Sequence, residues 1–349
     1  MKISKIERIK YNGPVYNFHC PPTENYFSEN ILVHNCYKSG SENLNRNMSL
    51  ETFKTILDKF DVECFQVELN DGTIFWTNDF KKTVRDNVKS VTTTNRSRLE
   101  QLAAGSGSYG VENPEVFDMM EYARSKGVIP NITIANVTDD AADKFSKLCG
   151  AMAISKYADK NICYDTIKKL TDRGMTQINI HFVLHKHSKN LAIETMKDMM
   201  TDPRLSKMNA IVFLSLKKKG NGENLQTLSQ EGFEEVINFA FENKIKFGMD
   251  SCSGGKFMSA ISSREDFNKI MEQVEPCEST KISSYINVDG KFYSCSFCEN
   301  TESFKCGLDV VNCNSFVDDI WEHPHTTQWR NNLIEKNNAG NFSCPVFEV

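Results

Sequence analysis

An alternation of apolar and amphipathic segments along residues 99–275 constrains the fold more than any other feature of this sequence. VIPNITIAN is followed by DDAADKFSKL, TQINIHFVL by KNLAIETMKDMM, and AIVFLSL by QEGFEEVINFAFEN. Apolar runs of about 5–8 residues that precede amphipathic segments of about 10–15 residues are typical of βα units in a buried parallel sheet. Because such crossovers are right-handed, the pattern predicts an α/β fold, either an open doubly wound sheet or a curved, partial (β/α) barrel.

The composition excludes several classes of protein. The chain has 349 residues and a formal net charge of −5, with the hydrophobic and charged fractions of an ordinary globular protein. It has no apolar run of about 18 residues, as a transmembrane helix would need, and its opening MKISKIERIKYNG lacks the apolar stretch of a signal peptide. The charge gives no reason to expect nucleic acid or a membrane as a partner. We expect a cytoplasmic protein of one large domain or two.

A strand–turn–strand pattern in residues 1–35 ends in His34-Asn35, directly before Cys36. The side-chain amide of an Asn can attack its own backbone carbonyl and cut the bond to the next residue. A neighbouring His can protonate the leaving amide, and a Cys after the cut supplies a thiolate that accepts an acyl group. His34, Asn35 and Cys36 are therefore candidate catalytic residues for cleavage at this junction.

The stretch VYNFHCPPTENYFSENILVHNC resembles the C-terminal splicing region of an intein, with Cys36 as the first residue of the downstream extein. The resemblance implies that Asn35 cyclises and that Cys36 is the nucleophile of transesterification. Since 35 residues precede the junction, it implies the C-terminal fragment of a split intein and trans-splicing with a separately encoded N-terminal half. Asn17 and Glu24 depart from the commonest pattern, and the alternatives are a degenerate remnant or a truncated gene.

From Cys36 onward, CYKSGSENLNRNMSLETFKTIL resembles the part of radical SAM enzymes that follows the third cysteine of their CxxxCxxC loop. In that family three thiolates hold a 4Fe–4S cluster, which binds S-adenosylmethionine and yields a 5′-deoxyadenosyl radical on reduction. Leu32 and Ser28 occupy the positions of the other two cysteines. The resemblance implies that the N-terminal partner supplies both cysteines and the first barrel strand, and that Cys36 later becomes a cluster ligand.

Polar and small residues at predicted strand ends match the family positions that contact S-adenosylmethionine. A glycine-rich segment loosely matches the one near the cofactor's amino group but lacks its acidic residue, and Ser155 matches a residue that contacts the ribose. We expect these residues at the carboxyl ends of the strands, where parallel barrels place their active sites. For Ser155, Asn179 and His181 the alternative is an ordinary polar side chain whose hydrogen bonds are formed within the fold. The implied cofactor contacts are Gly105, Ser106, Gly107, Ser155, Asn179 and His181.

Twelve cysteines in a chain expected to be cytoplasmic point to metal binding or catalysis, because reducing compartments disfavour disulfides. The run SYINVDGKFYSCSFC predicts two strands joined at Asp289-Gly290, with a CxxC pair after the second. Two thiolates at this spacing suit a tetrahedral metal or a cluster. The spacing Cx12Gx4C resembles the SPASM or twitch extension of radical SAM enzymes. It implies one auxiliary iron–sulfur cluster with the ligands Cys277, Cys295, Cys298 and Cys344.

The remaining cysteines do not extend this pattern. Cys306 and Cys313 do not reproduce the family spacing for a second cluster, so one auxiliary cluster is expected, with a zinc site as the alternative. The scattered cysteines are expected to be small buried hydrophobic side chains; they are Cys64, Cys149, Cys163 and Cys252.

Together these motifs predict an intein fragment at 1–35, a partial radical SAM barrel at 36–275 that lacks its first strand, and a cysteine-rich α+β extension at 276–349. Asp71-Gly72 predicts a hairpin insertion at 62–98. The main hypothesis is a trans-splicing precursor of a radical SAM enzyme, with a peptide or protein as its candidate substrate and no radical activity before splicing. The alternatives are a zinc- or cluster-stabilised binding module with an inactive intein remnant, and a gene fragment with no standing role.

Overall fold

The structure is a computed structural model that describes residues 47–60, 66–69, 113–156, 159–219, 222, 225–272, 274–299, 301 and 307–347. The predicted intein segment, Cys36 and the glycine-rich segment at 105–107 lie outside these residues.

Helices and strands alternate along most of the described chain, and short helical turns are labelled η. In chain order the elements are α1 (Leu50–Asp58), β1 (Gln66–Leu69), α4 (Val116–Ser125), β2 (Ile129–Ile134), α5 (Asp139–Leu148), β3 (Met152–Ser155), α6 (Lys160–Asp172), β4 (Ile178–Leu184), α7 (Lys189–Thr201), η2 (Pro203–Leu205), β5 (Ala210–Ser215), α8 (Gln230–Glu242), β6 (Phe247–Met249), η4 (Ser251–Ser253), α9 (Gly254–Ile261), α10 (Phe267–Met271), β7 (Tyr285–Ile286), β8 (Lys291–Tyr293), η5 (Ser296–Cys298), β9 (Leu308–Asp309), η6 (Val317–Trp321) and α11 (Pro324–Asn338).

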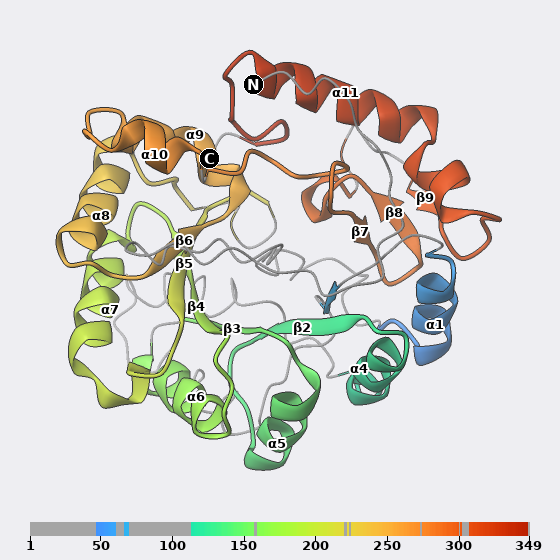
Figure 1. The fold of residues 1–349 in the computed structure, drawn as a ribbon, viewed down its shortest axis with the longest axis horizontal. Coiled ribbons are helices and arrows are strands. Elements are labelled where there is room, and N and C mark those ends of the chain that lie inside the picture. The colour runs from blue at the N-terminus through green and yellow to red at the C-terminus, as the bar shows by residue number, and fades with distance from the viewer. Residues whose placement is uncertain are drawn as a thin grey trace.

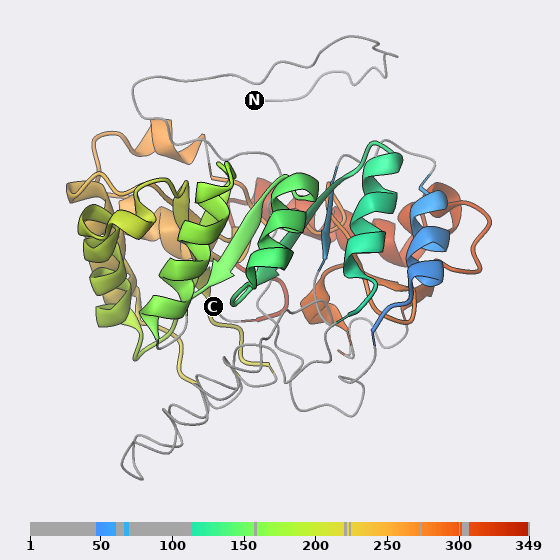
Figure 2. The ribbon, with the colours of Figure 1, turned by 90° about the horizontal axis from the view of Figure 1, so that it is seen from below.

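The main sheet is parallel, and its strands follow one another in sequence order from β1 to β6. Right-handed crossovers with this order put every connecting helix on the same face. In Figure 1 the strands follow an arc with α4 to α8 on its outside, and Figure 2 shows these helices side by side along the sheet. A doubly wound sheet would carry helices on both faces. The predicted α/β class is confirmed, and the described sheet is open, since β1 and β6 do not pair with each other.

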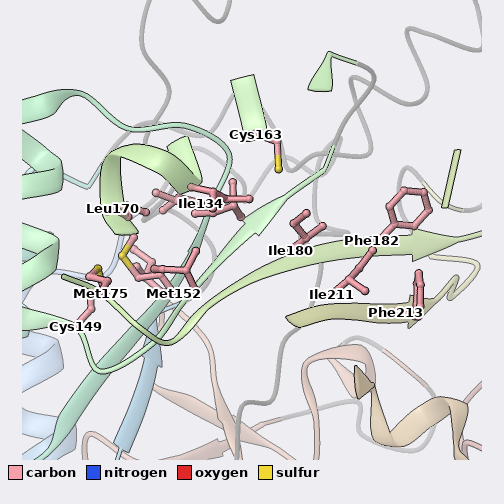
Figure 3. Packing of buried hydrophobic residues seen from close by; sticks show 14 of the residues in the cluster. Ile134, Cys149, Met152, Cys163, Leu170, Met175, Ile180, Phe182, Ile211 and Phe213 are labelled. Atoms are coloured by element: carbon pink, nitrogen blue, oxygen red, sulfur yellow. The ribbon is translucent and has the colours of Figure 1, made fainter. Parts of the chain in front are cut away.

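Alternate residues of the strands face the helices and form the main core. Ile180 and Phe182 of β4 and Ile211 and Phe213 of β5 are at most 2% exposed and pack among helix side chains such as Leu170 (Figure 3). Burying one such side chain contributes about 1.5–3 kcal/mol. The residues between them belong to the opposite face of the sheet, because side chains alternate along a strand.

Two of the scattered cysteines belong to this core, as predicted. Cys149 and Cys163 are 7% and 1% exposed, and the Sγ of Cys149 lies 3.8 Å from the Sδ of Met120. Burial raises the pKa of both thiols to about 12, so both stay protonated at neutral pH.

Side-chain oxygen atoms at the N-termini explain where several helices begin. Ser49 accepts a hydrogen bond from the backbone N–H of Thr52 at the start of α1. Thr138, Asp159 and Ser229 do the same for α5, α6 and α8. Each such cap stabilises its helix by about 1 kcal/mol.

The segment Gln66–Leu69 differs from the prediction of a hairpin insertion at 62–98. It is a strand of the main sheet, and Gln66 pairs in parallel with Ile129, in register with β2. A strand run and a turn signal are local, whereas the pairing partner lies far along the chain, so the sequence could not distinguish the two arrangements. The Asp71-Gly72 turn and the rest of that segment lie outside the described residues.

The C-terminal module, residues 274–347, contains the antiparallel sheet β7-β8-β9 and the helix α11. The predicted turn between β7 and β8 is confirmed, with Gly290 at φ 71°, a left-handed conformation that favours glycine. A second core joins Phe292, Val310 and Ile320 of the module to Ile56 of α1.

The C-terminal module contacts both ends of the open sheet (Figure 1). At the α1 end, the Lys59 ammonium donates to the Cys313 carbonyl at 2.5 Å, and the Phe60 and Phe316 rings lie 4.4 Å apart. At the α9 end, a Cβ placed on Gly254 would lie 3.7 Å from the Cβ of Phe342. The module therefore spans the gap that the open arc leaves. None of the described helices combines the length and the apolar character needed to cross a membrane.

Candidate functional site

Seven of the predicted site residues fall within the described part of the chain. His34, Asn35, Cys36, Gly105, Ser106 and Gly107 lie outside it, so the splicing junction and the glycine-rich contact stay predictions. The described seven are Ser155, Asn179, His181, Cys277, Cys295, Cys298 and Cys344.

Ser155 and His181 lie side by side on adjacent strands. They are register partners between β3 and β4, and they are 7% and 1% exposed. Both alternate with the core-facing residues Ile154 and Ile180, so they belong to the face of the sheet opposite the connecting helices. Ser155 is the last residue of β3 and lies at the carboxyl end of the sheet, as expected.

Asn179 lies at the other end of the sheet from the expected position. It is the second residue of β4, and its Oδ1 accepts a hydrogen bond from the Nδ2 of Asn209, 3.0 Å away and just before β5. The period of two puts Asn179 on the same face as His181, but two residues of a strand rise about 6.6 Å. A shared face therefore does not place Asn179 at the carboxyl end, and its amide is satisfied within the fold.

The CxxC pair forms a compact turn after β8. The Sγ atoms of Cys295 and Cys298 are 3.4 Å apart, and the Cys298 N–H donates to the Cys295 carbonyl at 3.0 Å. In a tetrahedral site with Zn–S bonds of about 2.3 Å, two sulfurs would be separated by about 3.8 Å. The interaction with Cys298, together with burial, raises the pKa of Cys295.

Cys277 and Cys344 lie close enough to this pair to interact electrostatically with it. Burial, with smaller contributions from the sulfurs of Cys295 and Cys344, raises the pKa of Cys277 to about 12. Cys295 likewise interacts with Cys344. The four predicted ligands, which come from three separate segments, are therefore gathered into one sulfur-rich region.

Cys252 belongs to the same region, although the sequence predicted only a small buried side chain. Cys252 is 9% exposed and lies in η4, after the carboxyl end of β6. Its thiol interacts with Cys344, which raises the pKa of Cys252 and lowers that of Cys344 below the usual range. The sequence feature that could have identified Cys252 as a site residue is its position shortly after a strand of the parallel sheet, in the sequence DSCSGG.

A buried ion pair lies next to these thiols. The ammonium of Lys217, after β5, contacts the carboxylate of Asp250, after β6, and both side chains are under 10% exposed. Although burial alone would lower the pKa of Lys217, the charges of Asp250 and of the neighbouring thiols raise it. The positive charge of Lys217 favours the thiolate form of Cys344. The sulfur-rich region therefore lies at the carboxyl end of β5 and β6.

Buried polar atoms without partners surround the CxxC pair. The hydroxyls of Ser294 and Ser296, which flank Cys295, and the Oε2 of Glu278, which follows Cys277, have no hydrogen-bond partner among the described residues. Burial raises the pKa of Glu278 to about 7. Hydroxyls beside a thiolate are suited to donate to the sulfur atoms of a bound cluster.

The residues present suit an iron–sulfur cluster or zinc by donor type, since thiolates are the preferred ligands of both. Within the described ranges, however, no group of three or more His, Cys, Asp or Glu side chains is arranged so that it could hold a metal ion. Binding would therefore require the sulfurs to move closer together. The thiol of Cys313 donates to the Val310 carbonyl at 3.1 Å, and Cys313 belongs to the second core together with Cys298.

No protein-family model matches the chain, and a search of curated proteins found no matching sequence. Any function proposed for the chain therefore depends on its own residues and their geometry.

Proposed function

We propose that the chain is a trans-splicing precursor whose product is a radical SAM enzyme with one auxiliary iron–sulfur cluster. The observation that supports this most directly is the gathering of Cys277, Cys295, Cys298 and Cys344 at the carboxyl end of an open parallel sheet. Strands in sequence order with helices on one face are also what a partial (β/α) barrel requires.

In the splicing step, the side-chain nitrogen of Asn35 attacks its own backbone carbonyl. The bond to Cys36 breaks, Asn35 becomes a succinimide, and His34 donates a proton to the leaving nitrogen. Before this cleavage, the Cys36 thiolate accepts the acyl group of the N-terminal partner and displaces the first nucleophile of the intein's N-terminal half as the leaving group. After the cleavage, the acyl group moves from the Cys36 sulfur to the freed Cys36 amine. The new chain would carry the two missing cysteines directly before Cys36.

In the spliced enzyme, a cluster bound by Cys36 and two further thiolates would supply the electron that cleaves S-adenosylmethionine to a 5′-deoxyadenosyl radical. Ser155 and His181 contribute polar atoms to the face of the sheet opposite the connecting helices, where they would orient the cofactor. A peptide or protein is the proposed substrate class. The unspliced chain has one of the three thiolates and would not carry out this chemistry.

The test is mass spectrometry of the tryptic peptide that ends in Cys36-Tyr37-Lys38, from cells that make the protein. We expect foreign residues, including two cysteines, in front of Cys36, and we expect Asn35→Ala to abolish that peptide. Persistence of His34-Asn35-Cys36 as the only form, or an unaltered spliced peptide in the Asn35→Ala chain, would refute the splicing proposal.

A second candidate is a zinc-stabilised binding module that keeps its intein segment. The observation that favours it is the 3.4 Å separation of the Cys295 and Cys298 sulfurs, which is close to the edge of a tetrahedral zinc site. Metal analysis of the purified chain distinguishes the two candidates. About four iron atoms with sulfide per chain support the enzyme, whereas one zinc atom without sulfide supports the module.

A further inference from the structure

The chain segment around Cys344 lies against the turn that carries Cys252. A Cβ placed on Gly254 would lie 3.7 Å from the Cβ of Phe342, and one placed on Gly255 would lie 3.5 Å from the backbone nitrogen of Ser343. Both glycines open α9, two and three residues after Cys252. The start of α9 and the Cys344 segment therefore pass close to each other, two or three residues after Cys252 and one or two residues before Cys344.

The same segment also contacts the CxxC turn. The centroids of the Phe347 and Phe297 rings lie 5.9 Å apart, and Phe297 is one of the two residues between Cys295 and Cys298 in the sequence. The ammonium of Lys219 donates to the carbonyl of Phe297 at 2.9 Å, which fastens the CxxC turn to the loop after β5. Residues 342–347 are thus held between the end of β6 and the CxxC turn.

Cys344 lies between the residues of this segment that contact the start of α9 and the residue, Phe347, that contacts the CxxC turn. Its thiol raises the pKa of Cys252, and it adds to the larger effects that raise the pKa of Cys277 and of Cys295, so these three thiols lie near it. Lys217 lies over the Phe297 ring, 5.5 Å from its centroid, and pairs with Asp250, two residues before Cys252. The environment of Cys252 therefore belongs to the sulfur-rich region, unlike those of Cys149 and Cys163 in the main core.

We propose that Cys252 is a ligand of the metal centre to which the C-terminal cysteines belong, so that the parallel sheet itself supplies one of its thiolates. The inference rests on the auxiliary centre in the proposed function. It adds Cys252, which the cysteine spacing in the sequence did not identify as a ligand. With Cys252 the region holds five thiols, one more than a 4Fe–4S cluster binds.

The test uses the full chain in a Cys36→Ser background, so that the splicing cysteine cannot bind iron. The chain is reconstituted without oxygen from ferrous iron and sulfide, reduced, and examined by iron and sulfide analysis and by electron paramagnetic resonance. Cys252→Ser is compared with Cys163→Ser, a matched buried thiol in the main core. We expect Cys252→Ser to lower the iron content or shift the g values, and Cys163→Ser to change neither.

Unchanged iron content and g values in Cys252→Ser would overturn the inference and leave the auxiliary centre intact. A parent chain that takes up no iron would instead refute the auxiliary centre of the proposed function, and this inference with it.

A second measurement needs no substitution at Cys252. Iodoacetamide labelling of the Cys36→Ser chain, in urea too dilute to unfold it, is read by mass spectrometry before and after iron–sulfur loading. We expect loading to slow the labelling of Cys252 and Cys295 but not that of Cys163. Equal labelling of Cys252 in both forms would also overturn the inference.

Discussion

The Lys217–Asp250 pair shows how single residues join the sheet to the sulfur-rich region. The two side chains follow adjacent strands, and Ser253 also donates to the Asp250 carboxylate while its oxygen lies 2.7 Å from that of Ser215. A buried charge is tolerated only when such partners are present.

We therefore predict that Asp250→Asn lowers the free energy of unfolding of the metal-free chain by about 3–5 kcal/mol, because it leaves the Lys217 ammonium buried beside a neutral amide. Urea denaturation followed by circular dichroism measures the change. Asp172→Asn is the matched control: Asp172 pairs with Lys168 and Lys207 at the exposed surface, and we expect little effect there. Equal stabilities of the two variants would contradict the prediction.

Individual residues also show what the sequence could reveal about the candidate site. The position of Ser155 at a strand end followed from the local apolar pattern, whereas its pairing with His181 depends on the register between β3 and β4, which no local pattern gives. The nearness of Cys252 to Cys344 depends on how the chain end packs on α9, and no local pattern encodes that. The end of the sheet at which Asn179 lies depends on where β4 begins, which periodicity does not define.

At the scale of elements, the sheet has two chemically different faces. The helix-facing side of β5 carries Ile211 and Phe213, which are fully buried, while Val212 between them is half-buried on the other side. The face opposite the connecting helices carries the polar side chains of Ser155 and His181 and a small apolar cluster of Ala153, Val212 and Leu214.

The two faces predict different costs for neighbouring truncations. Ile211→Ala should destabilise the chain by about 2–5 kcal/mol, because it leaves a cavity between the sheet and the helices. Val212→Ala should cost about 1 kcal/mol, because less apolar surface is lost. Urea midpoints of the two variants measure both effects, and a larger loss for Val212→Ala would show that the assignment of faces is wrong.

The elements differ in how well the sequence predicted them. The strands and helices between 113 and 250 follow long, regular apolar patterns, and the structure contains them where they were expected. The two-residue strand β9 is too short to show a pattern, and α11 was not predicted because it buries little more than Thr326 and Leu333. The parallel pairing of β1 depends on a distant partner, β2, and was missed for that reason.

For the whole molecule, a bound metal would tie together the end of β6, the segment of Cys277, the CxxC turn and the segment of Cys344. Removing it with a chelator under reducing conditions should lower the melting temperature by several degrees, because the native state loses the binding free energy. Differential scanning calorimetry before and after chelation measures the shift. A chain with both Cys295→Ser and Cys298→Ser should show no such shift, and an equal shift in that chain would place the metal elsewhere.

The position of α1 between the two hydrophobic cores determines how the molecule unfolds. It buries Phe53 and Leu57 in the main core and Ile56 in the second core. The two cores therefore cannot separate while α1 stays folded in its place, and the parallel sheet and the C-terminal module should lose structure in one cooperative transition rather than in two. Amide hydrogens along α1 would then exchange with solvent only as fast as the entire described body opens.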